Sequence, residues 1–169
     1  MSEARSRTIT IREVRPDEHR AVAELTVSVY ADVLGPLLSE GYVAQLSDVD
    51  RRAREAAVLV AVDTADRLLG SVTFVPGLGP YAEFDGPDEA GIRMLVVAPA
   101  AQRRGVGTAL VRACIDRARE AGRRRLALHT VEEMAGAKRL YERLGFRRAP
   151  ERDADPEPGV HLLGYVLDV

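Results

Sequence analysis

The pattern of apolar and polar positions predicts short strands separated by amphipathic helices. Apolar runs or alternations of strand length occur at residues 8–14, 58–63, 68–75, 92–98, 126–130 and 161–167. Helical spacing, with Gly and Pro as breaks, occurs at residues 17–30, 37–46, 48–57, 105–121 and 131–144. In the fourth of these helices, Val111, Cys114, Ile115 and Ala118 share one face. The pattern therefore predicts one α/β domain with a mixed sheet and flanking helices over residues 8–169, preceded by a flexible terminus at residues 1–7.

Several residues mark where the helices begin and end. Thr130 and Glu133 match a capping box, so we expect the last helix to begin directly after Thr130. Gly122 and Gly145 are placed to end the last two helices, and Phe146 occupies the apolar position of a Schellman motif. The strand–helix–strand stretch over residues 92–130 predicts a right-handed parallel crossover. Residues 76–91 and 147–159, rich in Gly, Pro and charge, predict loops.

Composition narrows the class of protein. The 169 residues carry a formal net charge of -2, so there is no overall basic field to attract nucleic acid or an anionic membrane. The single cysteine, Cys114, excludes an intrachain disulfide framework and a cysteine-rich zinc site. The histidines are too widely spaced for a metal motif; they are His19, His129 and His161. We therefore expect no metal, no nucleic-acid partner, no membrane association and a cytoplasmic location.

One turn has the features of an anion site. The segment Gln102-Arg103-Arg104-Gly105-Val106-Gly107 lies between a predicted strand and a predicted helix. Glycines there permit positive φ and close approach of a ligand, and the first amides of a helix lack intrahelical acceptors. A pyrophosphate would suit this turn, and the two arginines would add donors. The plainer reading is a tight turn with solvated arginines. A Walker loop is absent, and Leu110 replaces the third glycine of a dinucleotide motif.

Two motifs together resemble the GCN5-related N-acetyltransferase (GNAT) superfamily. The turn is similar to its Q/R-x-x-G-x-G/A signature, and the segment from Leu140 to Phe146, read as L-Y-x-x-x-G-F, resembles its second signature. The order of predicted elements extends the resemblance over essentially the whole chain from Thr8. It implies a GNAT-like fold, with a central mixed sheet of six to seven strands, about four helices, and a splay between the fourth and fifth strands.

The resemblance also implies roles for residues and acetyl-CoA as the donor cosubstrate. The amide of Leu95 would polarise the thioester carbonyl, and Tyr141 would protonate the departing thiolate. Alternatively, Tyr141 is an ordinary core aromatic. The family's asparagine seven residues before this tyrosine is Met134 here. The implied cofactor-binding residues are Leu95, Val96, Val97, Gln102, Arg103, Arg104, Gly105, Val106, Gly107, Thr108 and Tyr141.

The acceptor amine needs a group to take its proton, because an alkylammonium has a pKa of about 10. We expect Glu89 to be this general base, with Glu83 and Asp88 as alternatives; Glu89 could also be a solvated loop residue. The acidic loops around residues 83–89 and 151–157 suggest a cationic acceptor, unless they are simply solvated. Arg93 argues the other way, because it could bind a substrate carboxylate or pair with Glu89. Glu83 and Arg93 are thus candidate substrate-binding residues.

These residues favour an enzyme that transfers acetyl from acetyl-CoA directly to a primary amine of a small molecule or peptide. Cys114, in the middle of a helix, is expected to be structural rather than catalytic. The alternative is a non-catalytic acyl-CoA-binding or regulatory domain that keeps the fold. A different acyl group, such as succinyl or propionyl, and a homodimeric assembly remain open.

Overall fold

The computed structural model describes residues 8–169, so the predicted flexible terminus at residues 1–7 lies outside the described residues. Within that part of the chain, eight strands form one mixed sheet in the order β1-β2-β3-β4-β5-β8-β6, with β7 paired to β8. The strands are β1 (Thr10–Glu13), β2 (Ala57–Val62), β3 (Leu68–Val75), β4 (Glu89–Val97), β5 (Arg125–Val131), β6 (Arg147–Arg148), β7 (Ala154–Glu157) and β8 (Val160–Asp168). The mixed α/β, GNAT-like fold predicted from the sequence is confirmed, with one strand more than expected.

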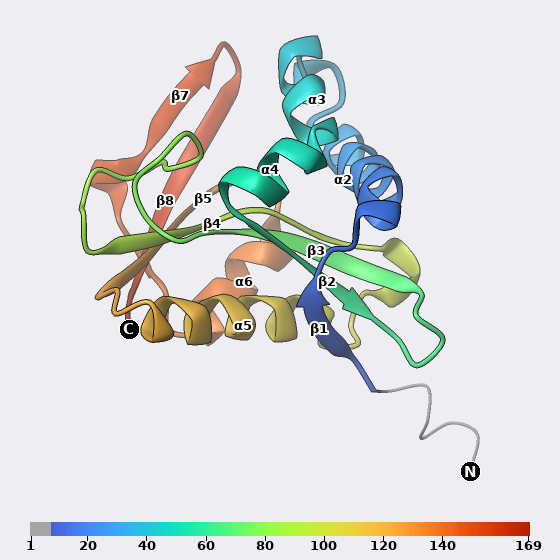
Figure 1. Cartoon of the computed structure of the whole chain (residues 1–169). Coiled ribbons are helices and arrows are strands. Elements are labelled where there is room, and N and C mark those ends of the chain that lie inside the picture. The colour runs from blue at the N-terminus through green and yellow to red at the C-terminus, as the bar shows by residue number, and fades with distance from the viewer. Residues whose placement is uncertain (1–7) are drawn as a thin grey trace.

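Helices cover both faces of the sheet. The α-helices are α2 (His19–Leu34), α3 (Glu40–Ser47), α4 (Val49–Glu55), α5 (Val106–Glu120) and α6 (Ala135–Arg143). Short 3-10 turns lie at Pro16–Glu18, Gly35–Leu37, Pro99–Ala101 and Pro150–Arg152. In Figure 1, α5 and α6 lie on one side of the sheet and α2, α3 and α4 on the other. A strand covered on both faces has no solvent side, which explains the continuous apolar run in β2.

The side-chain alternation of β2 divides the core between the two helical layers. Leu59 and Ala61 belong to the cluster that packs under α5, whereas Val58 and Val60 pack with residues of α2 and α4. The predicted face of α5 is buried against the sheet. Its inward residues are Val111, Cys114, Ile115 and Ala118. The helix periodicity read from the sequence therefore gave the correct inner face.

The central pair β4 and β5 is parallel, as the strand–helix–strand prediction required. Their pairing runs only from Glu89 opposite Arg125 to Ile92 opposite Leu128, although both strands continue beyond it. The two strands therefore separate after Ile92, which confirms the predicted splay. β5 is then held on its other side by antiparallel pairing with β8 along its full length.

Two local predictions were wrong. The capping box does not form, because Thr130 lies within β5 and α6 begins only after Met134. Pairing with β8 extends through Val131 and holds these residues in the sheet. Residues 147–159 are not all loop, since they contain β6, β7 and a 3-10 turn. The β7–β8 hairpin rises above the sheet beside α3 (Figure 1).

The predicted ends of the last two helices are correct. Gly122 and Gly145 both have positive φ, at 71° and 95°. The amide of Phe146 donates to the carbonyl of Tyr141 at 3.0 Å, the long-range bond of a Schellman motif, and the Phe146 ring is buried. This motif fixes the position of Tyr141, which the candidate site uses.

Candidate functional site

The turn before α5 presents backbone amides to solvent. Gly105 has φ 79° and caps the helix without a side-chain hydrogen bond. The first intrahelical bond runs from the Ala109 amide to the Gly105 carbonyl, so the amides of residues 106–108 precede it. Residues 102–105 are exposed, and Arg103 also has positive φ. The turn therefore has the backbone geometry that an anion such as a pyrophosphate requires.

β4 is bulged where it leaves β5. Arg93 pairs with Thr73 and Val96 with Ser71, so two residues of β4 oppose a single residue of β3. Met94 has φ 55°, which is unusual for a side chain of its kind. Because a bulge turns backbone groups out of the regular ladder, the segment at Met94 and Leu95 is able to present its amides to a ligand in the splay.

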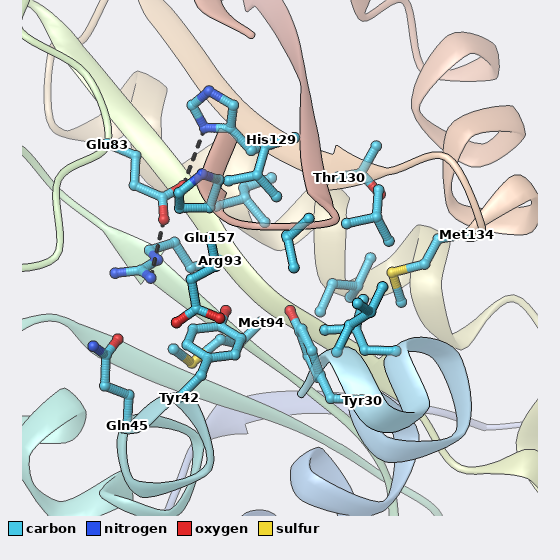
Figure 2. Close-up of a pocket in the computed structure, with 18 of the residues that line it drawn as sticks. Tyr30, Tyr42, Gln45, Glu83, Arg93, Met94, His129, Thr130, Met134 and Glu157 are labelled. Carbon is cyan, nitrogen blue, oxygen red and sulfur yellow. Dashed lines mark hydrogen bonds and ion pairs between the residues drawn. The ribbon is translucent and has the colours of Figure 1, made fainter. Parts of the chain in front are cut away.

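A cavity of about 280 Å³ opens between the splayed strands, α2, α3, α6 and the β7–β8 hairpin. Figure 2 shows its labelled lining residues. The predicted residues Glu83, Arg93, Leu95 and Tyr141 line it, together with residues that sequence reasoning did not select. These additional polar and aromatic residues are Tyr30, Tyr42, Gln45, His129, Thr130 and Glu157.

Tyr141 combines a packing role with access to the cavity. Its ring centroid lies 5.6 Å from that of Phe146 and 6.2 Å from that of Tyr165, and the residue is 4% exposed. It nevertheless contributes to the cavity wall. Burial raises the pKa of Tyr141 well above its ordinary value, with a smaller effect from Cys114. The phenol therefore stays protonated at neutral pH and is able to act as a proton donor.

A second titratable group lies at the other end of the cavity. Glu83 accepts from Arg93 Nη2 at 3.0 Å and contacts His129 Nδ1 at 3.1 Å. His129 Nε2 lies 2.7 Å from the carbonyl oxygen of Arg152. A carbonyl and a carboxylate are both acceptors, so the arrangement favours donation by both ring nitrogens, which is the imidazolium form of His129. Accordingly, the Glu83 carboxylate raises the pKa of His129.

The same arrangement keeps Glu83 ionised. Burial opposes its ionisation, but the hydrogen bond with His129 and the charge of Arg93 outweigh that effect and lower the pKa of Glu83. The Arg93 guanidinium also lies over the Tyr81 ring, at 5.7 Å from its centroid. These three residues therefore form a fixed cation–anion–cation group in the cavity wall.

Glu89 has different contacts from those expected of a base. Its carboxylate accepts from Arg152 Nη2 at 2.6 Å and from the Gly86 amide at 3.1 Å. It is 4% exposed and is not part of the cavity lining. At about 3.3 Å per strand residue, it lies roughly 20 Å along β4 from Leu95. This distance disfavours direct proton transfer, and its role as base stays a prediction for a variant test.

Several carboxylates of the two acidic loops are paired with cations of the protein itself. Besides Glu83 and Glu89, Asp153 pairs with Arg148 at 2.7 Å and Asp155 with His161 at 2.6 Å. Glu157 accepts from the Ser39 hydroxyl at 3.0 Å across the rim of the cavity. These pairs weaken the argument for a cationic acceptor.

Of the other predicted cofactor residues, Val96 is buried in the core and Val97 packs against it. Gly107 packs closely, because an added Cβ would lie 3.0 Å from a methyl group of Leu140. Within residues 8–169, no grouping of three or more potential ligands could hold a metal ion. Nor does any described helix have the length and apolar character that crossing a membrane requires.

Comparisons with known proteins agree with this geometry. A family model described as the acetyltransferase (GNAT) family matches residues 12–146. Mycothiol acetyltransferase from Renibacterium salmoninarum is 31% identical over 143 residues, which make up 83% of this chain and 41% of that protein. The chain thus spans about two fifths of the length of this curated relative.

Solved structures share the fold at low sequence identity. An acetyltransferase of the GNAT family from Staphylococcus aureus Mu50 has a TM-score of 0.78 and 14% identity, with 95% of this chain and 99% of that chain covered. The structure of yncA from Salmonella typhimurium with its cofactor acetyl-CoA has a TM-score of 0.68 and 24% identity, covering 95% and 93%.

Proposed function

This chain belongs to the GNAT acetyltransferase family, and on that premise we propose that it transfers acetyl from acetyl-CoA to a primary amine of a small molecule or peptide. The observation that carries the proposal is the splay after Ile92, where a bulged strand and Tyr141 border one cavity. Bound there, acetyl-CoA would supply a thioester whose carbonyl carbon accepts the amine.

The residues fit the two ends of such a donor. Amides at the start of α5, with Gln102, Arg103 and Arg104 beside them, would hold the pyrophosphate. The backbone of Leu95, Val96 and Val97 would pair with the pantetheine arm as one strand pairs with another.

Two groups would act at the reacting atoms. The Leu95 amide would donate to the carbonyl oxygen as negative charge develops on it. The Tyr141 hydroxyl, which lines the cavity and is protonated at neutral pH as a phenol is, would give its proton to the thiolate that leaves. The cytoplasmic location and the homodimer stay predictions from the sequence.

A CoA-release assay with acetyl-CoA and a panel of amines tests the proposal. We expect turnover with at least one amine and CoA binding by calorimetry, with binding kept and turnover lost in Tyr141→Phe. Tyr165→Phe is the matched control, since this buried phenol contacts the Tyr141 ring but does not line the cavity. CoA binding without turnover of any amine would instead indicate the non-catalytic alternative.

A further inference from the structure

The end of the cavity formed by Arg93, Glu83 and His129 carries a net positive charge. Glu83 is shared by two cations, since Arg93 is always charged and His129 has only acceptors around its ring. The side chains of Arg93 and His129 are 13% and 12% exposed, so solvent screens them poorly. One carboxylate cannot neutralise both cations, and one positive charge is left over.

A further guanidinium lies behind this end. Arg52 is 1% exposed and donates through Nη1 to the carbonyls of Gln45 and Leu46, at 2.7 and 2.9 Å. Both acceptors are neutral, so its charge is not cancelled by them. Burial lowers the pKa of Arg52, an effect that the nearby Tyr81 and Tyr30 partly oppose. Its link to the cavity is the carbonyl of Gln45, a residue that also lines the cavity.

The opposite end of the cavity has another character. In Figure 2, Glu83, Arg93, His129, Gln45 and Glu157 lie on one side, whereas Met134 lies on the other with Tyr30 between. Apolar residues and Tyr141 also line the cavity. An acceptor whose amine meets the thioester would therefore direct its remaining groups toward the cationic end.

We propose that the acceptor carries a carboxylate, or an anionic group of similar chemistry, in addition to its amine, that Arg93 binds this group, and that the charge of His129, whose two ring nitrogens already have partners, strengthens the attraction. This inference rests on the proposed function, since it concerns the acceptor of that reaction. Glu157 is an opposing charge on the same side of the cavity, but it is exposed, so solvent screens it more strongly than the largely buried Arg93 and His129. Size favours a small molecule such as an amino acid over a long polymer, because the cavity holds only about 280 Å³.

Binding of acetylated products tests the site without turnover. Calorimetry with CoA present would compare the N-acetyl derivatives of leucine, methionine and phenylalanine with the corresponding N-acetyl amides, which lack the negative charge. We expect the acid to bind about tenfold or more tightly than the amide in at least one pair, as charged hydrogen bonds do. If no acid binds better than its amide, the inference is overturned.

Two variants test which side chain causes the preference for the acid over the amide. Arg93→Gln should bring the acid-to-amide ratio close to one. Glu157→Gln removes a carboxylate from the same cavity and should leave the ratio unchanged or larger. A ratio that survives in Arg93→Gln would contradict the assignment.

The pH dependence of the unmodified protein gives an independent measurement if Arg93→Gln fails to fold. The probes do not titrate between pH 6 and 9, because a carboxyl group has a pKa of about 4 or below and the amine is acetylated. The charged groups facing His129 are Glu83, Arg152 and Arg93, which keep their charges over this range. The ratio should fall as pH rises and His129 loses its proton, and His129→Gln should flatten the curve. A ratio independent of pH in the unmodified protein would exclude His129 from the site.

Turnover separates this inference from the proposed function. With acetyl-CoA, kcat/KM for leucine should exceed that for leucinamide and for 3-methylbutylamine. If leucinamide, 3-methylbutylamine or a polyamine reacts faster than leucine, the inference of an anionic acceptor is overturned. The proposed acetyltransferase activity would still stand. Absence of turnover with every amine would overturn the proposed function, and the binding ratio would still decide whether the anion site exists.

Discussion

Replacing Glu89 by Gln separates a catalytic from a structural role for this carboxylate. The side chain of Glu89 is 6% exposed and that of its partner Arg152 is 24% exposed. Breaking a fully buried pair costs about 3–5 kcal/mol, whereas an exposed pair contributes at most about 1 kcal/mol. Gln can still accept the bonds from Arg152 and Gly86, so we expect a loss of about 2 kcal/mol. For a chain of this length that lowers Tm by roughly 4–8 °C.

Thermal unfolding and the CoA-release assay would be measured on the same preparations. Asp88→Asn is the matched control, because it removes an adjacent carboxylate that is exposed. The control should stay within about 0.5 kcal/mol of the unmodified protein. Well below its Tm, Glu89→Gln should keep kcat/KM within about tenfold, since the carboxylate lies outside the cavity.

The opposite result would refute this reasoning. A general base contributes about 10²–10⁴-fold, and its loss is partly recovered at high pH, where the amine is already deprotonated. An unchanged Tm with a loss of about 100-fold at pH 7, recovering toward pH 10, would make Glu89 the base. It would also require a chain of waters or side chains between Glu89 and Leu95.

Other predictions concern the donor side, the turn and the ion pairs. Tyr141→Phe should keep CoA affinity by calorimetry and lower kcat by about 10²–10⁴-fold; an equal rate would exclude it as the acid. Gly105→Ala forces an alanine into positive φ and should destabilise the fold by about 1–2 kcal/mol. Gly41→Ala, in open space within α3, should instead raise Tm slightly. Thermal unfolding of the two variants would be compared. Because its pKa is raised in the folded protein, protonated His129 stabilises the fold. This contribution is fully present below about pH 6.5 and is lost as the pH rises through the folded pKa. Urea unfolding at pH 6 and 9 should show this decline, and His129→Gln should reduce it.

The turn before α5 and the helix end that positions Tyr141 could be predicted from the sequence because both depend on local residues. Gly105 is needed where the chain takes positive φ, and the helix that follows shows its buried face as a 3.6-residue period. The second motif fixes Tyr141 because Gly145 and Phe146 end the same helix four and five residues later. Each of these features depends on residues that are close together in the sequence, so it can be predicted from the pattern of residue types.

The acceptor side could not be predicted in the same way. Glu83, Arg93 and His129 come from a loop, β4 and β5, and nothing in the order of residues says that they meet. Tyr30 and Tyr42 fall in two separate predicted helices, residues 17–30 and 37–46, and the sequence pattern gives no sign that both line the same cavity. The capping box at Thr130 failed for a related reason, since β8 holds that residue in a strand.

The two halves of the site therefore differ in what they can recognise. The proposed donor half would consist chiefly of backbone amides at a bulge and at a helix start, and these groups are the same whatever the side chains are. The acceptor half consists of side chains from separate elements, so each substitution there changes shape or charge directly. Because Glu83 has both Arg93 and His129 as partners, replacing Glu83 would alter two cations at once. The charge of this group, rather than the turn before α5, should thus decide which amine the protein accepts.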